Sequence, residues 1–328
     1  MKVAVYTVWP VTFWQCPPSQ VARLKERFPD IEFVHPANES EGMEAFVDAD
    51  IAFSSGFTTA MLAKAARLRW VHSTAAAVAG LLPLPELAAR NITVTNSRGI
   101  QAVAMAEHVI GGLLLLARQF DALLMAQQRR RWIQNEISVA TWPRTLHGRS
   151  LTVLGLGSIG QEIARRGHAF GMKVTGVRRR ADRPKPDFVD RVLPPDKLND
   201  ALDNCDVLVI AAPFLPTTDR LIGAKQLSLL NRGAIVVNVA RGQIIDEQAM
   251  IAALKSGQLG GAVLDVFEKE PLDESSPLWS LPNVVVTPHC SGYRPDHWDD
   301  VIDLFSENLR RFQRGQPLLN VIDSAVGY

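Results

Sequence analysis

The chain of 328 residues has few cysteines and no long apolar segment, and both shortages narrow its class. Its three cysteines, Cys16, Cys205 and Cys290, lie far apart and are odd in number. They predict neither a disulfide framework nor a metal site, and they favour a reduced, cytoplasmic setting. The most apolar run, 109–117, is far shorter than the roughly 20 residues of a membrane-spanning helix, so we expect a buried helix there.

The chain also lacks a charge excess, since 35 Lys and Arg face 34 Asp and Glu, for a formal net charge of +1. Nothing in this balance predicts a nucleic-acid or membrane partner. The alternating start, residues 1–8, predicts a strand instead of a signal peptide. The length is sufficient for two domains.

Short β-like runs alternate with helical runs in both halves of the chain, a pattern that predicts parallel sheets covered by helices. The expected strands of the first half are 3–8, 31–34, 51–54, 70–73 and 92–95, and its clearest helices are 19–28 and 59–66. The second half repeats the pattern with strands at 151–154, 173–177, 206–210, 234–238, 261–264 and 284–287, a weaker one near 190–193, and helices at 158–170, 197–203, 224–230 and 246–256. We therefore predict an α/β fold of two doubly wound, Rossmann-like or flavodoxin-like domains.

The segments between these halves suggest how the domains connect. A helical stretch is expected over about 101–131, followed by an extended arm at 132–146 that covers a partner subunit and carries Trp132, Trp142 and Pro143. A final amphipathic helix, about 296–314, is expected to pack back on the first domain. The predicted boundaries are 1–98 with 291–328 for a substrate-binding domain, and 99–290 for a dinucleotide-binding domain. A cleft between two such domains suits a small substrate.

The strand 151–154 ends in the motif G-x-G-x-x-G, formed by Gly155, Gly157 and Gly160, and a helix is expected to follow. The first glycine permits a sharp turn, the second lets a pyrophosphate approach the backbone, and the third lets helix and strand pack closely. The exposed N–H groups and helix dipole then face the phosphates. The alternative is an ordinary strand–turn–helix packed by small residues.

The next strand ends at Arg178, where an acidic residue would bind the ribose 2′-hydroxyl of NAD. Here Arg178, Arg179 and Arg180 follow one another, and arginine forks bind a 2′-phosphate as charge-assisted pairs. We therefore prefer NADP(H), with NAD(H) still possible. A solvated basic loop, or Asp182 or Asp187 folding back onto the ribose, is the alternative.

Polar residues follow the last three expected strands. Arg241 is placed to clamp a carboxylate, Asp265 to hold a nicotinamide carboxamide, and His289 to transfer a proton to a carbonyl oxygen. Glu270 lies in a loop before Pro271 and is a candidate partner for the imidazole. Taken singly, Arg241 fits a surface salt bridge equally well and His289 fits a structural histidine. We interpret the remaining histidines as structural: His35, His72, His108, His147, His168 and His297.

Taken together and in order, 155–160, Asn238 to Gly242, 264–272 and Pro288-His289 resemble the D-isomer-specific 2-hydroxyacid dehydrogenase family. The resemblance covers nearly the whole chain. It implies a catalytic set of Arg241, Glu270 and His289. It also implies cofactor contacts at the glycine turn and beyond: Leu156, Ser158, Ile159, Ala212, Pro213, Thr218, Val239, Ala240 and Asp265.

The resemblance further implies that backbone N–H groups of Ala76 and Ala77 bind the substrate carboxylate, although the loop reads Ala77-Val78-Ala79 where the family often has Gly-Val-Asp. Glu270 stands where formate-oxidising relatives have Gln, which argues against that activity. Arginine at 178 makes the chain look like the NADP-using reductases for glyoxylate and hydroxypyruvate. The expected activity is reversible reduction of a small 2-oxoacid to the D-2-hydroxyacid by a homodimer. An NAD-dependent oxidative dehydrogenase and a dinucleotide-sensing, corepressor-like binding protein are the rivals.

Overall fold

The computed structural model describes residues 1–78, 80–140 and 144–323. The chain divides into two compact units, Met1–Ile100 with Tyr293–Tyr328, and Gln101–Gly292. Each crossing lies two residues later than the boundaries that we expect from the sequence. The predicted cleft between the two stays a prediction.

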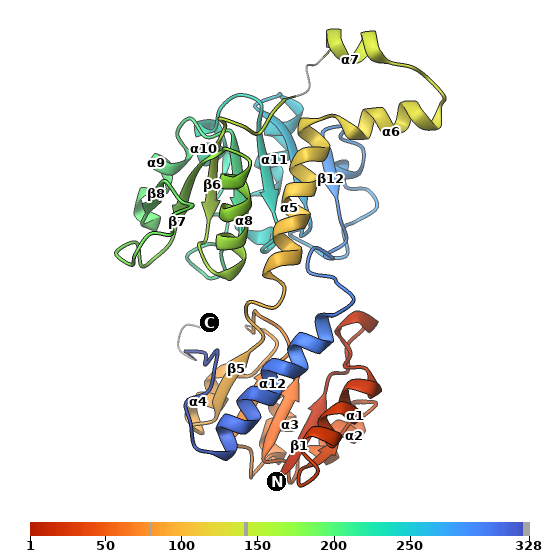
Figure 1. Cartoon of the computed structure of the whole chain (residues 1–328), viewed down its shortest axis with the longest axis vertical. Helices are drawn as coiled ribbons and strands as arrows, with labels where there is room; N and C mark the ends of the chain where they lie inside the picture. The colour runs from red at the N-terminus through yellow and green to blue at the C-terminus, as the bar shows by residue number, and fades with distance from the viewer. Residues whose placement is uncertain (79, 141–143, 324–328) are drawn as a thin grey trace. The chain divides into compact units, whose positions relative to one another are not determined.

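The first unit is a five-stranded parallel sheet in the order β2-β1-β3-β4-β5. Its strands are β1 (Lys2–Tyr6), β2 (Glu32–Val34), β3 (Ile51–Ser54), β4 (Trp70–Ser73) and β5 (Thr93–Asn96). Its helices are α1 (Pro18–Arg27), α2 (Glu39–Ala45), α3 (Thr59–Lys64), α4 (Leu84–Ala89) and α12 (His297–Gln313), with a 3₁₀ turn, η1 (Thr12–Trp14). This is the flavodoxin-like order of a doubly wound sheet, and it confirms the predicted class (Figure 1).

Helix α12 joins the core of this unit although it lies more than 190 residues after β5. Its buried Trp298, Val301 and Phe305 recur at helical spacing and pack with Phe53 and Trp70 of the sheet. The Phe53 and Phe305 rings lie 4.6 Å apart between centroids, and those of Trp70 and Phe305 lie 5.3 Å apart. The final helix therefore packs on the first unit, as its amphipathic pattern predicts.

The second unit is a seven-stranded parallel sheet in the order β12-β11-β10-β9-β6-β7-β8. Its strands are β6 (Ser150–Leu154), β7 (Lys173–Val177), β8 (Arg191–Leu193), β9 (Val207–Ile210), β10 (Ala234–Asn238), β11 (Leu259–Leu264) and β12 (Val284–Val286). Its helices are α5 (Ala102–Ala117), α6 (Phe120–Gln128), α7 (Gln134–Ala140), α8 (Ser158–Ala169), α9 (Leu198–Leu202), α10 (Ala224–Leu229) and α11 (Glu247–Lys255). The 3₁₀ turns are η2 (Pro195–Lys197), η3 (Gly242–Ile244) and η4 (Pro277–Trp279).

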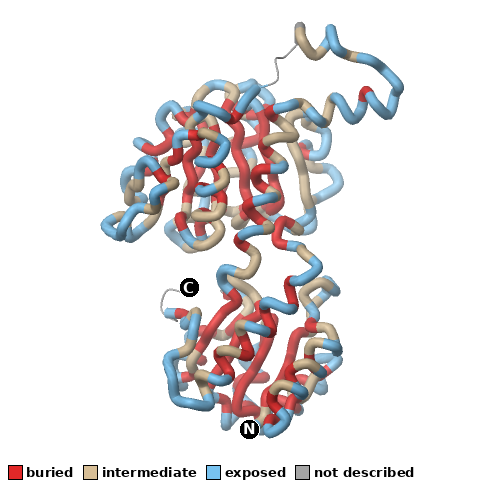
Figure 2. The backbone as a smooth tube through the Cα atoms, in the orientation of Figure 1, coloured by how far each residue is buried: buried red, intermediate tan, exposed pale blue. Residues whose placement is uncertain are grey.

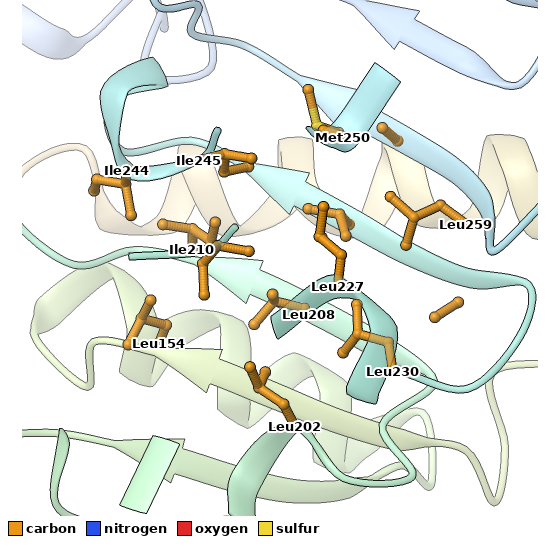
Figure 3. Packing of buried hydrophobic residues seen from close by; sticks show 14 of the residues in the cluster. Leu154, Leu202, Leu208, Ile210, Leu227, Leu230, Ile244, Ile245, Met250 and Leu259 are labelled. Atoms are coloured by element: carbon orange, nitrogen blue, oxygen red, sulfur yellow. The ribbon is translucent and has the colours of Figure 1, made fainter. Parts of the chain in front are cut away.

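Both faces of this sheet are covered, and the central strands are buried throughout (Figure 2). On one face, Leu208 and Ile210 of β9 pack with Leu227 of α10 and Met250 of α11 (Figure 3). The other face packs against α5 and α8. The order in which successive strands are added to the sheet reverses between β6 and β9. Loops therefore diverge there at the carboxyl edge of the sheet, which is where doubly wound folds bind ligands.

The segment after α5 differs from the prediction. The expected helix over 101–131 breaks after Ala117, because Gln119 adopts a left-handed conformation with φ of 56°. The predicted extended arm instead contains α7, and α6 and α7 extend away from the rest of the unit (Figure 1). Trp142 and Pro143 lie outside the described residues. Within the described ranges, no helix is by itself long and apolar enough to cross a membrane; α5 and α6 reach that length and apolarity only as a pair, which is bent by 69°.

Candidate active site

Three predicted side chains of the second unit follow three neighbouring strands at the same edge of the sheet. Arg241 comes after β10, Glu270 after β11 and His289 after β12. Because parallel strands present their carboxyl ends at one edge, loops that are distant in sequence converge there. The geometry of each loop decides which of these side chains come into contact.

The turn that carries Arg241 is built by two neighbours. The buried Asn238 side chain donates to the Arg241 carbonyl at 2.9 Å and accepts from the Ala240 N–H at 3.0 Å. A Cβ at Gly242 would lie 1.8 Å from the Phe267 carbonyl carbon, so only glycine lets this turn pack against the loop after β11. The turn therefore brings Arg241 beside the loop of Glu270.

The Arg241 guanidinium is half-buried, and its Nη1 donates to the Ala240 carbonyl at 2.6 Å. Burial lowers the pKa of Arg241, and the charge of Glu270 opposes that effect. Burial alone would raise the pKa of Glu270, but hydrogen bonds from His289 and the Phe267 N–H, with the charges of His289 and Arg241, hold it below its usual value. Glu270 therefore interacts with both His289 and Arg241.

Glu270 and His289 form a direct pair. The His289 Nδ1 lies 2.8 Å from one carboxylate oxygen of Glu270, and the other oxygen accepts from the Phe267 N–H at 3.0 Å. The side chains are 35% and 46% exposed, respectively, so the pair is open enough to meet a small molecule. Since Nδ1 faces the carboxylate, Nε2 is the ring nitrogen left to contact a ligand.

The buried Asp265 holds the loop of His289, a role that we do not predict from the sequence. Its carboxylate accepts from the Thr287 hydroxyl at 2.7 Å and from the N–H groups of Cys290 at 2.9 Å and Ser291 at 3.0 Å. His289 itself lies in the left-handed region, with φ of 51°. The predicted contact of Asp265 with a nicotinamide carboxamide stays a prediction, because a carboxylate can still accept a further bond.

The glycine turn after β6 has the shape that the motif predicts. Gly155 has φ of 98°, and a Cβ there would lie 2.7 Å from the Ala211 carbonyl oxygen. A Cβ at Gly160 would lie 1.8 Å from the Gly155 carbonyl oxygen, whereas nothing lies within 4 Å of one at Gly157. The space over Gly157, at the start of α8, is thus open for a phosphate group, and these residues fit a dinucleotide pyrophosphate.

The other predicted cofactor residues differ in what they expose. Leu156 turns its side chain into the core against Gly176, so only its backbone is available to a ligand. Ser158 and Ile159 open α8 and are half-buried, while Ala212 and Val239 are buried, Ala240 is half-buried and Pro213 is exposed. The Thr218 hydroxyl accepts from the Leu215 N–H at 2.7 Å and donates within its own turn.

Arg178, the first residue after β7, ties its own loop together. One guanidinium nitrogen donates to the carbonyls of Arg183 and, at 3.0 Å, Pro184. Its Nε is buried without a hydrogen-bond partner among the described residues. Arg178 is half-buried, while Arg179 and Arg180 are exposed. The arginine run therefore forms an ordered basic turn next to the dinucleotide motif.

The predicted carboxylate loop lies in the first unit, after β4. The Asn96 side chain donates to the Ala76 carbonyl at 2.5 Å and fixes the loop, while Ala77 is exposed. Ala79 lies outside the described residues. Within the described ranges, no three His, Cys, Asp or Glu side chains group as metal ligands.

Comparisons with known proteins agree on one family. The family model described as D-isomer specific 2-hydroxyacid dehydrogenase, NAD binding domain, matches residues 110–291. The chain is 33% identical over 252 residues to a glyoxylate reductase of Korarchaeum cryptofilum, covering 75% of this chain and 73% of that protein. It is 29% identical over 304 residues to a D-3-phosphoglycerate dehydrogenase of Methanocaldococcus jannaschii, and spans 92% of this chain but 57% of that relative's length.

Solved structures give the same result over the whole length. A D-isomer specific 2-hydroxyacid dehydrogenase family protein of Aeromonas salmonicida is 36% identical with a TM-score of 0.83, covering 98% of this chain and 99% of that chain. An NADPH-dependent glyoxylate/hydroxypyruvate reductase of Sinorhizobium meliloti, in complex with NADP and sulfate, is 28% identical with a TM-score of 0.83. The match covers 100% of this chain and 99% of that chain.

Proposed function

The chain belongs to the D-isomer specific 2-hydroxyacid dehydrogenase family, and from that premise we propose that it reversibly reduces a small 2-oxoacid, such as glyoxylate or hydroxypyruvate, to the D-2-hydroxyacid with NADPH. The observation that carries the proposal is the Glu270–His289 pair beside Arg241, at the edge that also carries the open glycine turn. The family acts on CH–OH groups with a nicotinamide dinucleotide.

Different residues of the chain have different roles in the proposed reduction. Arg241 binds the substrate carboxylate and polarises the carbonyl. The N–H groups of Ala76 and Ala77 are the further carboxylate donors that the family resemblance implies. The hydride for the carbonyl carbon comes from the reduced nicotinamide when the dinucleotide is bound. His289 donates its Nε2 proton to the oxygen as negative charge develops there, because Nδ1 is held by Glu270.

Glu270 supports this proton transfer by its charge and its geometry. Its pKa lies below the ordinary value, so it is ionised at neutral pH and favours the imidazolium form of its partner. The Phe267 N–H fixes its second oxygen and so fixes the direction of the pair. In the oxidative direction the same imidazole accepts the proton from the hydroxyl.

The dinucleotide site supports a preference for NADPH. The pyrophosphate would lie over Gly157 with Ser158 and Ile159, and Ala212, Pro213, Thr218, Val239 and Ala240 would line the remainder. At the end of β7, Arg178 and Arg179 stand where an acid would repel a 2′-phosphate. The ordered basic turn, and a structural neighbour that is NADPH-dependent by name, support this assignment.

We also propose a homodimer, joined through α6 and α7. Leu124 and Met125 are 54% and 53% exposed and Trp132 is 87% exposed, which is unusual for such large apolar side chains. Leu123, Trp132 and Ile137 line an apolar groove of about 610 Å³ on this arm. A second copy of the chain would cover these exposed side chains and the groove. Light scattering after gel filtration should give twice the mass of one chain for the wild type. The double variant Leu124→Glu with Met125→Glu should give the mass of a single chain. A monomeric wild type would contradict the dimer.

Purified protein tested with glyoxylate, hydroxypyruvate, pyruvate and bulkier oxoacids, each with NADPH and NADH, decides the activity. Turnover of a small oxoacid with NADPH as the better cofactor is the expected result. NADPH binding with no turnover of any oxoacid would contradict the enzyme proposal. A cytoplasmic location, predicted from the cysteine content, belongs to this proposal and is tested by cell fractionation.

A further inference from the structure

We propose that His108 and Thr287 are positioning residues that hold the His289 loop in its working conformation through Asp265. This inference rests on the proposed function, since it concerns how His289 is kept in place for proton transfer. It starts from a hydrogen-bonded chain that crosses from α5 to the loop after β12, between residues 179 positions apart.

The buried Asp265 gathers three consecutive N–H groups of the loop. Its backbone carbonyl accepts from the His289 N–H at 3.0 Å, and its carboxylate accepts from the N–H groups of Cys290 and Ser291 at 2.9 and 3.0 Å. Together these bonds hold His289 at φ of 51°, a conformation that residues with a side chain rarely adopt. Without them the loop would relax and the imidazole would leave Glu270.

The fourth bond to Asp265 comes from a side chain. The Thr287 hydroxyl donates to the same carboxylate oxygen as Cys290, at 2.7 Å. His108 of α5 lies behind it, with Nε2 at 3.2 Å from the hydroxyl oxygen. The loop is thereby anchored to α5, the helix that packs across the middle of the unit.

The number of protons fixes the direction of this chain. A hydroxyl carries one proton, and Thr287 gives it to a carboxylate that has none to return. Toward His108 the hydroxyl oxygen is then an acceptor, so His108 must donate from Nε2. His108 is therefore predicted to carry its proton on Nε2 in the ligand-free protein. This constraint on the tautomer does not apply to the exposed His168 of α8.

Replacing Thr287 tests the anchor. Thr287→Val removes the hydroxyl but keeps the shape, and kcat for oxoacid reduction should fall on the order of tenfold because a bond to a charged group is lost. The KM for NADPH should stay within about twofold, since the dinucleotide residues are untouched. Thr287→Ser keeps the hydroxyl and should restore most of kcat. Thr93→Val is the matched control on β5 of the first unit, where the hydroxyl forms no hydrogen bond with the described residues.

Replacing His108 tests the second step. His108→Leu should lower kcat by about three- to fivefold, and His108→Gln, which keeps an N–H donor, should lower it less. His168→Leu is the control. Thermal unfolding of each variant separates these effects from misfolding, because Thr287→Ser and His108→Gln retain the bonds that would be needed to fold.

A readout that does not need turnover is the tautomer itself. Long-range ¹H–¹⁵N spectra of histidine-labelled, ligand-free protein should show His108 protonated on Nε2 at neutral pH, and Thr287→Val should shift the signals of His289. His108 protonated on Nδ1 alone would overturn the chain, as would a Thr287→Val enzyme with the kcat of the wild type. If the wild type reduces no oxoacid, the proposed function fails, while the spectra still decide whether the anchor exists.

Discussion

His72 and His289 each lie near the carboxyl end of a parallel strand, one in each unit. His72 belongs to β4 and is fully buried, with Nδ1 at 2.8 Å from the Thr95 hydroxyl and Nε2 at 3.3 Å from the Ser97 hydroxyl. Burial lowers the pKa of His72 to about 3, so it stays neutral. His289 is half-exposed, and a carboxylate takes the place of the hydroxyl groups.

The difference between these two regions lies in what each imidazole faces. Inside a core and next to neutral hydroxyl groups, nothing stabilises a second proton on the His72 ring. His72 therefore contributes to the first unit by packing and hydrogen bonding. The ionised Glu270 at an open edge supports the proton transfer that we propose for His289. The residue type is the same, but the surroundings suit His72 to a structural role and support the proposed role of His289 in proton transfer.

Removing the open imidazole should have the largest effect. His289→Ala deletes the proposed proton donor, so kcat should fall by about a hundred- to ten-thousandfold, the usual contribution of a positioned acid. The dissociation constant for NADPH should change little, because the residues proposed to hold the dinucleotide are unchanged. Steady-state kinetics and fluorescence titration measure the two quantities, with His168→Ala as control; near-normal turnover would remove His289 from the mechanism.

Changing the charge at the cofactor end should have a smaller effect. Arg178→Asp replaces a cation with an anion beside the expected 2′-phosphate, and the preference for NADPH over NADH should fall by about ten- to hundredfold. The ratio of kcat/KM for the two cofactors measures it. Lys173→Asp makes the same charge change at the exposed start of β7 and should leave the ratio unaltered. An unchanged ratio in Arg178→Asp would exclude the phosphate role.

The buried imidazole should affect stability and its dependence on pH. Between about pH 6.5 and 3, unfolded chains bind a proton at residue 72 that the folded chain does not, so the free energy of unfolding falls as the pH falls. The slope from this residue is at most about 1.4 kcal/mol per pH unit. Urea unfolding of His72→Gln between pH 6 and 4 should show a shallower slope than the wild type. Parallel slopes would mean that His72 gains no proton on unfolding.

Much of the fold follows from local pattern. Strands such as β3 and β10 are buried on both faces, so they appear in the sequence as continuous apolar runs whose bounds match the structure. The break at Gln119 has no such signal, because glutamine is not a residue that marks a left-handed turn. The sequence does not predict helix α7, because Gln134 to Ser138 is largely exposed and carries little periodicity.

The candidate site also has a part that the sequence predicts and a part that it does not. Arg241, Glu270 and His289 each follow a strand, and strand ends are visible in sequence. That Glu270 reaches His289 across 19 residues depends on β11 and β12 being neighbours, which the pattern only suggests. The bond between His108 and Thr287 has no local signal at all, because it depends on how α5 crosses the sheet.

The pH dependence of oxoacid reduction in Glu270→Gln tests whether Glu270 and His289 act together in proton transfer. The Glu270 carboxylate, ionised because its pKa is lowered, stabilises the charged imidazole, and the neutral amide cannot. Reduction by the variant should therefore fall off at a lower pH than reduction by the wild type, because the proton donor loses the stabilising charge of its partner. Superimposable pH profiles of kcat/KM for the two proteins would show that Glu270 does not support proton transfer by His289.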